Sequence, residues 1–115
     1  MRPDRLLLED ILEAIGEVLD TTPRTRAPFD ADKFRRSHVL RHIQIIGEAA
    51  RRLSQAVKDR HPQVPWIQIV GMRHVLVHDY FEVNWARVYE TARDQVPALK
   101  AQIEQILQSL PPEQP

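Results

Sequence analysis

Apolar side chains recur along most of the chain at steps of three and four, which is the spacing of one face of an α-helix. The first stripe predicts a helix over residues 4–20, with Asp4 as its N-cap. This stripe consists of Leu8, Ile11, Leu12, Ile15, Val18 and Leu19. Residues 21–30 contain two prolines and therefore predict a loop.

A second stripe predicts a long helix that starts near Asp30 or Asp32, either of which can cap it, and ends near residue 60, before His61-Pro62. This stripe consists of Leu40, Ile43, Ile46, Gly47, Ala50, Leu53 and Val57. Gly47 lies in mid-helix, where glycine costs roughly 1 kcal/mol relative to alanine. The close approach of another helix would explain a glycine there.

Residues 65–80 predict a third helix with Pro65 in its first turn. The fourth helix is expected to begin near Asn84, and Pro97 is expected to kink or divide it. Its apolar seam consists of Trp85, Val88, Ala92, Val96, Leu99, Ile103, Ile106 and Leu110. These segments predict an all-α antiparallel bundle in a single domain over residues 1–110, with a disordered tail at 111–115.

Composition narrows the class of protein. The chain of 115 residues has no cysteine, which excludes disulfides and thiolate metal sites and is consistent with the cytoplasm as its location. No apolar run approaches the ~20 residues that span a bilayer, and the N-terminus lacks the pattern of a signal peptide. A lone chain of this size has an unfavourable surface-to-volume ratio, so a homodimer is expected.

Charge is balanced overall, with 16 basic and 16 acidic residues, but it is unevenly distributed. Residues 33–61 carry eight Lys or Arg against two acids, whereas residues 1–20 carry two basic and six acidic side chains. The basic segment can form a local phosphate-binding face. Alternatively, its charges solvate the outside of a helix and pair with the acidic first helix.

Polar side chains that could take part in catalysis gather at the end of the third predicted helix, in residues 71–81. They are Arg73, His74, His78, Asp79 and Tyr80. An arginine can hold a phosphate through two parallel hydrogen bonds, and a histidine can transfer protons near neutral pH. On a straight helix five residues rotate the chain by about 140°, so Arg73 and His78 converge only if the helix loosens, if Arg73 reaches round, or across a two-fold axis. A purely structural alternative is that His78 caps the helix C-terminus.

This segment resembles the Arg-x4-His-x-Tyr signature of HepT-like proteins, a branch of the HEPN ribonucleases. The resemblance extends beyond the signature to four strings in the same order, the third of which contains it: LEDILEAI near the start, IIGEAARRL at 45–53, RHPQVPWIQIVGMRHVLVHDYF at 60–81 and QVPALKAQIEQIL at 95–107. The resemblance covers about residues 4–108.

The resemblance implies a four- or five-helix antiparallel HEPN-like bundle, a homodimer, and metal-independent cleavage of RNA. It also implies a partner, a minimal nucleotidyltransferase antitoxin that can silence the toxin by transferring AMP to the signature tyrosine. By position, Arg73 and His78 match the catalytic pair, and Tyr80 matches the AMP acceptor, although it could instead orient the RNA. The position after the arginine is often Asn in this branch and is His74 here, so the role of His74 stays open.

The chemistry suits these residue types without a metal, because RNA supplies its own nucleophile, the 2′-hydroxyl. His78 would act as general base or acid, and Arg73 would neutralise the phosphate. Glu48 either faces the site and holds Arg73 or pairs within its own helix with Arg51 or Arg52. Asp79 either orients His78 or merely flanks it, and the flanking role is favoured.

Other residues give weaker signals. His38 and His42 have a spacing that can bind a metal, but no carboxylate or third histidine stands at a matching spacing, so neither a metal nor another cofactor is expected. Trp66 and Trp85 are expected in the core or a dimer seam. Two rival functions remain: a non-catalytic helical module that binds a nucleotidyltransferase, and a plain structural helical domain.

Overall fold

The computed structural model describes residues 2–74 and 82–111, and these residues form helices and short connections without a β-strand. The elements are α1 (Asp4–Thr21), α2 (Arg26–Ala31), α3 (Lys33–Arg52), α4 (Gln55–Arg60), α5 (Trp66–Gly71), α6 (Trp85–Glu90), the π-helical turn η1 (Thr91–Gln95) and α7 (Val96–Ser109). The expected all-α class is therefore confirmed. No helix in the described ranges is long and apolar enough to cross a bilayer.

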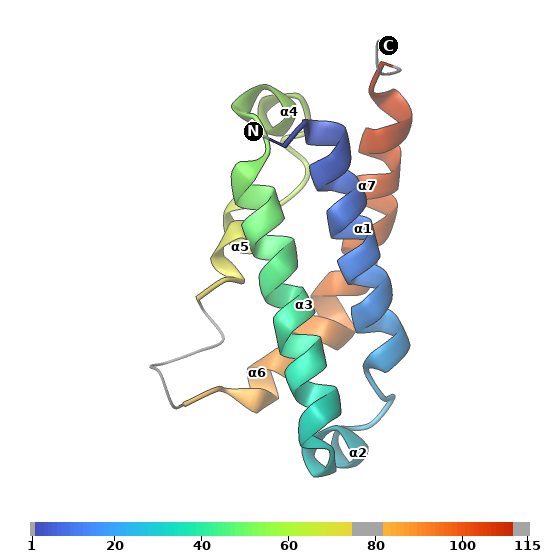
Figure 1. The fold of residues 1–115 in the computed structure, drawn as a ribbon, viewed down its shortest axis with the longest axis vertical. Helices are drawn as coiled ribbons and strands as arrows, with labels where there is room; N and C mark the ends of the chain where they lie inside the picture. Colours follow the sequence, from blue (N-terminus) through green and yellow to red (C-terminus); the bar gives the residue numbers. More distant parts are fainter. Residues whose placement is uncertain (1, 75–81, 112–115) are drawn as a thin grey trace.

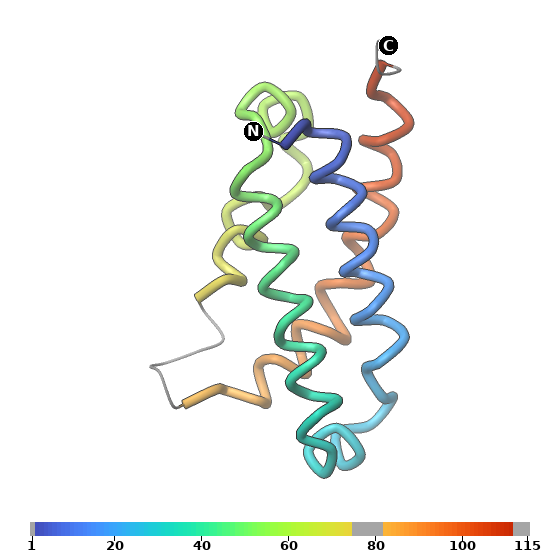
Figure 2. The backbone as a smooth tube through the Cα atoms, in the orientation of Figure 1, coloured from blue at the N-terminus to red at the C-terminus, as the bar shows by residue number. Residues whose placement is uncertain are grey.

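Three long helices form the body of the molecule. α1 lies between α3 and α7 and packs against both, and α5 packs against the other side of α3 (Figure 1). The chain runs down α1, back up α3, down α5 and up α7, so that the start of α1 and the end of α7 lie at the same end of the bundle (Figure 2). This is the expected antiparallel bundle, and it is 47 Å long and about half as wide.

The core forms where the predicted stripes of these helices meet. Its fully buried large side chains are Phe29, Leu8, Ile11, Ile15, Ile43, Ile46, Ile103, Ile106, Val18, Val39 and Val88. In the first half of α3 the residue buried in the core is Val39, whereas Leu40, which the predicted stripe placed in the core, is only partly buried. Trp66 is a core residue, 9% exposed, as one of the two expectations had it, and Trp85 is partly buried and packs against the core.

The predicted loop over residues 21–30 is wrong in part, because it contains the short helix α2. Pro28 occupies the third position of this helix, where a backbone N–H would have no helical partner in any case. Phe29 is completely buried and contacts Trp85 and Tyr89 at ring-centroid distances of 6.3 and 5.1 Å. Tyr89 in turn donates a hydrogen bond of 3.0 Å to the carbonyl of Pro23, so tertiary packing holds this segment.

The predicted second helix is divided after Arg52. Ser54 caps α4 by accepting a hydrogen bond from the Val57 N–H, and it is itself held by α1. The Asp4 carboxylate accepts hydrogen bonds from the Ser54 N–H (2.8 Å) and hydroxyl (2.7 Å). The prediction that Asp4 is the N-cap of α1 is therefore wrong, because Asp4 is the first helical residue. Its side chain instead binds Ser54 at the point where α3 and α4 are divided.

Two other predicted helix starts are confirmed, whereas Pro65, predicted in the first turn of the third helix, is the residue before α5. Asp32 caps α3 through a 3.0 Å hydrogen bond from the Arg35 N–H, and Asn84 caps α6 in the same way. Pro97 is the second residue of α7, and α7 directly follows the π-helical turn that divides the fourth predicted helix. The third helix ends at Gly71 and continues as a turn to residue 74, whereas the prediction extended it to residue 80; residues 75–81 lie outside the described part of the chain, as do residues 112–115 of the predicted tail.

Candidate functional site

The position of Arg73 depends on a close contact between α5 and α3. Arg73 lies in the turn after α5, which is anchored on the core by Ile69 and Met72, 2% and 5% exposed. A Cβ atom placed on Gly47 would lie 3.0 Å from the Arg73 backbone N, the Arg73 Cγ and the Ile69 carbonyl oxygen. Gly47 is therefore the position in α3 that lets this turn approach, which confirms the expected close approach of another helix.

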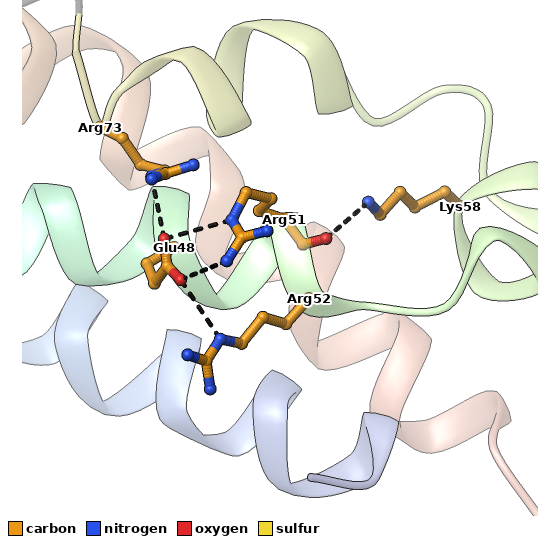
Figure 3. A network of polar contacts seen from close by, with 5 residues as sticks. All are labelled: Glu48, Arg51, Arg52, Lys58 and Arg73. Atoms are coloured by element: carbon orange, nitrogen blue, oxygen red, sulfur yellow. Dashed lines mark hydrogen bonds and ion pairs between the residues drawn. The ribbon is translucent and has the colours of Figure 1, made fainter. Parts of the chain in front are cut away.

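The Arg73 guanidinium contacts a carboxylate on α3. Its Nε lies 2.8 Å from Oε2 of Glu48 (Figure 3). The same carboxylate accepts hydrogen bonds from Arg51, at 2.8 and 3.3 Å, and from Arg52, at 3.2 Å. Both interpretations of Glu48 from the sequence thus apply together, because it pairs within its own helix and with Arg73. We call these four residues the arginine cluster.

The arginine cluster is positively charged and open to solvent. Three guanidiniums surround one carboxylate, and between 31% and 59% of each side chain is exposed. Hydrogen bonds from Arg51, then the positive charges of Arg51 and Arg73, lower the pKa of Glu48 to about 2. Glu48 is therefore ionised at neutral pH. Each guanidinium has five N–H donors, so the cluster can bind a phosphate in addition to the carboxylate.

Of the remaining predicted site residues, the structure describes only His74. His74 is exposed in the turn next to Arg73, and its backbone N–H donates to the Gly71 carbonyl at 3.0 Å. His78, Asp79 and Tyr80 lie outside the described residues. The convergence of Arg73 and His78 therefore stays a prediction.

The sequence did not single out two members of the arginine cluster as site residues. The sequence indicated Arg51 and Arg52 as members of the basic segment and as alternative partners of Glu48 within its own helix, because they lie three and four residues after it. Other charges of that segment pair locally, as in the contacts of Arg35 with Asp32. The basic segment thus supplies two cations to the cluster, while part of it behaves as an ordinary solvated helix surface.

A carboxylate does lie beside His38 and His42, although no acid stands at a matching spacing in their own helix. Glu17 of α1 brings a carboxylate to the two histidines of α3, with Oε1 lying 3.6 Å from Nε2 of His38. A helix-to-helix contact of this kind has no signature in the spacing of residues along the chain.

Comparisons with known proteins agree with one another. Residues 11–106 match the family described as Ribonuclease HepT-like. A protein of Thermococcus cleftensis named probable ribonuclease HepT is 36% identical over 101 residues, which cover 86% of this chain and 91% of that protein. A protein of Methanocaldococcus jannaschii named putative RNase MJ1380 is 33% identical over 104 residues, covering 90% of this chain and 95% of that protein. No solved structure matches the chain significantly.

Proposed function

Because the chain belongs to the HepT-like family of HEPN ribonucleases and is therefore an endoribonuclease, we propose that Arg73 and His78 are its catalytic pair. The protein then acts as the toxin of a two-component system whose antitoxin is a minimal nucleotidyltransferase. It works as a homodimer in the cytoplasm, and one domain over residues 1–110 carries the activity.

The arginine cluster is the observation that carries this proposal. Arg73 is solvent-accessible, and its ion pair with Glu48 fixes the direction of its guanidinium. The cluster keeps an excess of two positive charges over its single carboxylate, which favours an RNA phosphate at this surface. Glu48 is a positioning residue in this proposal, since it acts on the substrate only through Arg73.

The reaction needs no group beyond the RNA and these side chains. A base removes the proton of the 2′-hydroxyl, whose oxygen attacks the adjacent phosphorus. The bond from phosphorus to the 5′-oxygen breaks, and this oxygen takes up a proton, leaving a 2′,3′-cyclic phosphate on one fragment and a 5′-hydroxyl on the other. His78 supplies the base or the acid, and Arg73 stabilises the negative charge on the phosphate.

A nuclease assay tests the catalytic pair. His78→Ala is expected to cleave tRNA and mRNA ~10²–10⁴-fold more slowly than the wild-type chain, with unchanged helical content. His61→Ala is the matched control, because His61 lies in the connection after α4 and outside the arginine cluster.

RNA carrying 2′-deoxy nucleotides at the cleaved positions should resist the enzyme, and chelators should leave the rate unchanged. Wild-type rates from His78→Ala would remove His78 from the mechanism, and no cleavage by the wild-type chain would favour the rival role as a non-catalytic binding module.

The role of Glu48 is tested by a double-mutant cycle on kcat/KM with Glu48→Gln and Arg73→Lys. If Glu48 acts through Arg73, the loss in the double variant is much smaller than the product of the two single losses, because coupled residues are not additive. Independent losses would contradict the positioning role. The cycle separates this role from a general effect on folding, since a general effect would not depend on the residue at position 73.

Tyr80 is proposed as the acceptor of AMP, because a bulky anion near Arg73 would compete with RNA for the guanidinium. Incubation with ATP and a cognate nucleotidyltransferase should raise the intact mass by whole adenylyl groups and abolish cleavage. Tyr80→Phe should remain unmodified. An adduct that persists in Tyr80→Phe would assign the modification to another residue.

A further inference from the structure

Glu17, His38 and His42 lie together on the surface where α1 packs against α3, and none of them is a member of the arginine cluster. One ligand atom from each of these side chains lies within 4.8 Å of the other two. The carboxylate of Glu17 is 3.6 Å from Nε2 of His38, and the two imidazole rings have their centroids 4.2 Å apart. All three residues are partly buried, so solvent can reach them while the helices hold them in place.

We propose that Glu17, His38 and His42 form a binding site for one divalent transition-metal ion, with Zn²⁺ as the reference ion. The proposal does not depend on the function proposed above, because none of the three residues belongs to the arginine cluster. The ion would join α1 to α3 from outside the hydrophobic core.

The distances suit such an ion after small side-chain movements. Bonds of about 2.0–2.2 Å in a tetrahedral zinc site place the ligand atoms about 3.3–3.6 Å apart. The contact of 3.6 Å between Glu17 and His38 is already close to this value. The widest separation of 4.8 Å would have to close by about 1.5 Å, which rotation of partly exposed side chains supplies without movement of the helices.

A hydrogen bond prepares His42 for this role. Its Nδ1 lies 2.8 Å from the backbone carbonyl of His38, and a carbonyl oxygen can only accept a hydrogen bond. Nδ1 therefore carries the proton, and in the neutral ring the lone pair lies on Nε2. Metal-bound histidines are commonly oriented in this way, with the second ring nitrogen donating to a carbonyl or carboxylate.

The set of ligands determines the class of ion. Two imidazoles and one carboxylate favour Zn²⁺ and its neighbours Co²⁺, Ni²⁺ and Cu²⁺, whereas Mg²⁺ and Ca²⁺ prefer oxygen ligands throughout. Three protein ligands leave the fourth position of a tetrahedral ion for water or for another donor. The alternative role of these residues is a polar contact between His38 and Glu17 beside the tilted ring of His42, and the experiment distinguishes the two roles.

The test is a calorimetric titration of the untagged full chain with Zn²⁺, followed by titration with Co²⁺, whose visible absorption reports its coordination geometry. We expect one ion per chain. His38→Ala, His42→Ala and Glu17→Gln should each weaken binding by at least about tenfold, since even the loss of a partner that only orients a ligand costs ~10–100-fold. His61→Ala and His74→Ala are matched controls that remove a histidine elsewhere and should bind as the wild-type chain does. Mg²⁺ should not compete.

Thermal unfolding provides a second readout, because an ion that binds only the folded chain raises its melting temperature. Zn²⁺ should raise the melting temperature of the wild-type chain and of His61→Ala but not of His42→Ala. The proposal is overturned if no saturable binding occurs or if His42→Ala binds like the wild-type chain. It is also overturned if His61→Ala and His74→Ala weaken binding as much as the substitutions of the proposed metal ligands do. Far-ultraviolet circular dichroism of each variant identifies any that fails to fold. The variants of the other two proposed metal ligands then decide the result.

Discussion

Substitution of Gly47 by alanine tests whether α5 and the turn that carries Arg73 lie as close to α3 as described. Alanine is more favourable than glycine in a helix interior by about 1 kcal/mol. Against this gain, the new methyl group would lie 3.0 Å from two backbone atoms, the Arg73 N and the Ile69 carbonyl oxygen. Backbone atoms cannot rotate away as a side-chain end does, so α5 must shift by a few tenths of an ångström, and overpacking of this kind typically costs about 1–3 kcal/mol.

Gly16 is the matched control for this variant. It lies in α1, and a Cβ atom placed on it meets nothing within 4 Å. Gly16→Ala should therefore show the helix gain alone and raise the free energy of unfolding by about 1 kcal/mol. Because the gain in helix propensity is common to both variants, the difference between them isolates the close contact, and we expect Gly47→Ala to be less stable than Gly16→Ala by about 1–3 kcal/mol.

The assay is urea unfolding followed by circular dichroism, with the melting temperature as a second measure. For a chain of this length a difference of 1 kcal/mol corresponds to about 4 °C. RNA cleavage by Gly47→Ala should fall by more than its stability explains, since the shift of α5 displaces Arg73 from Glu48. Equal stabilisation by both alanines, together with undiminished cleavage, would refute the described packing of α5 on α3.

Three further predictions concern stability. Phe29→Ala should lower the free energy of unfolding by about 3–5 kcal/mol in urea titrations, because Phe29 is fully buried; a loss below 1 kcal/mol would show that α2 does not dock as described. Ser54→Ala should cost about 0.5–2 kcal/mol by removing the α4 cap and the hydroxyl hydrogen bond to Asp4, and Ser109→Ala, at the end of α7, should cost less. The lowered pKa of Glu48 contributes stability that is complete above about pH 4.5 and is lost as the pH falls towards 2, so Glu48→Gln should flatten the dependence of unfolding on pH in this range; an unchanged acid profile would contradict the ion pairs of Glu48.

The long helices could be predicted from the sequence because their burial is periodic. The stripe of α1 and the seam of α7 repeat every three or four residues, and that period is a local property of the chain. Helix α2 and the break before Ser54 could not be predicted in this way. The first depends on Phe29 reaching Trp85 and Tyr89, and the second on the carboxylate of Asp4, fifty residues away in the sequence.

The candidate site was predictable to a similar degree. Arg73 stood out by its residue type and its neighbours, its catalytic role was implied by the resemblance to HepT-like proteins, and its pairing with Glu48 was one of two interpretations. The pairing follows from the packing of α5 on α3, where Gly47 provides the space. Glu17 was missed near His38 and His42 for the same reason, because the contact is made between helices and leaves no spacing to detect.

The short length of α5 makes Arg73 dependent on this packing. An isolated helix of six residues is not stable in water, so α5 keeps its conformation only through its contacts with α3 and the core. Ile69 and Met72 provide the apolar contacts, Gly47 allows the approach, and Glu48 fixes the guanidinium. The α3 face that holds Arg73 therefore connects core packing to the proposed chemistry. Small displacements of α5 should reduce cleavage before they unfold the bundle, because catalysis tolerates shifts of only about 1 Å in the position of Arg73 relative to the phosphate.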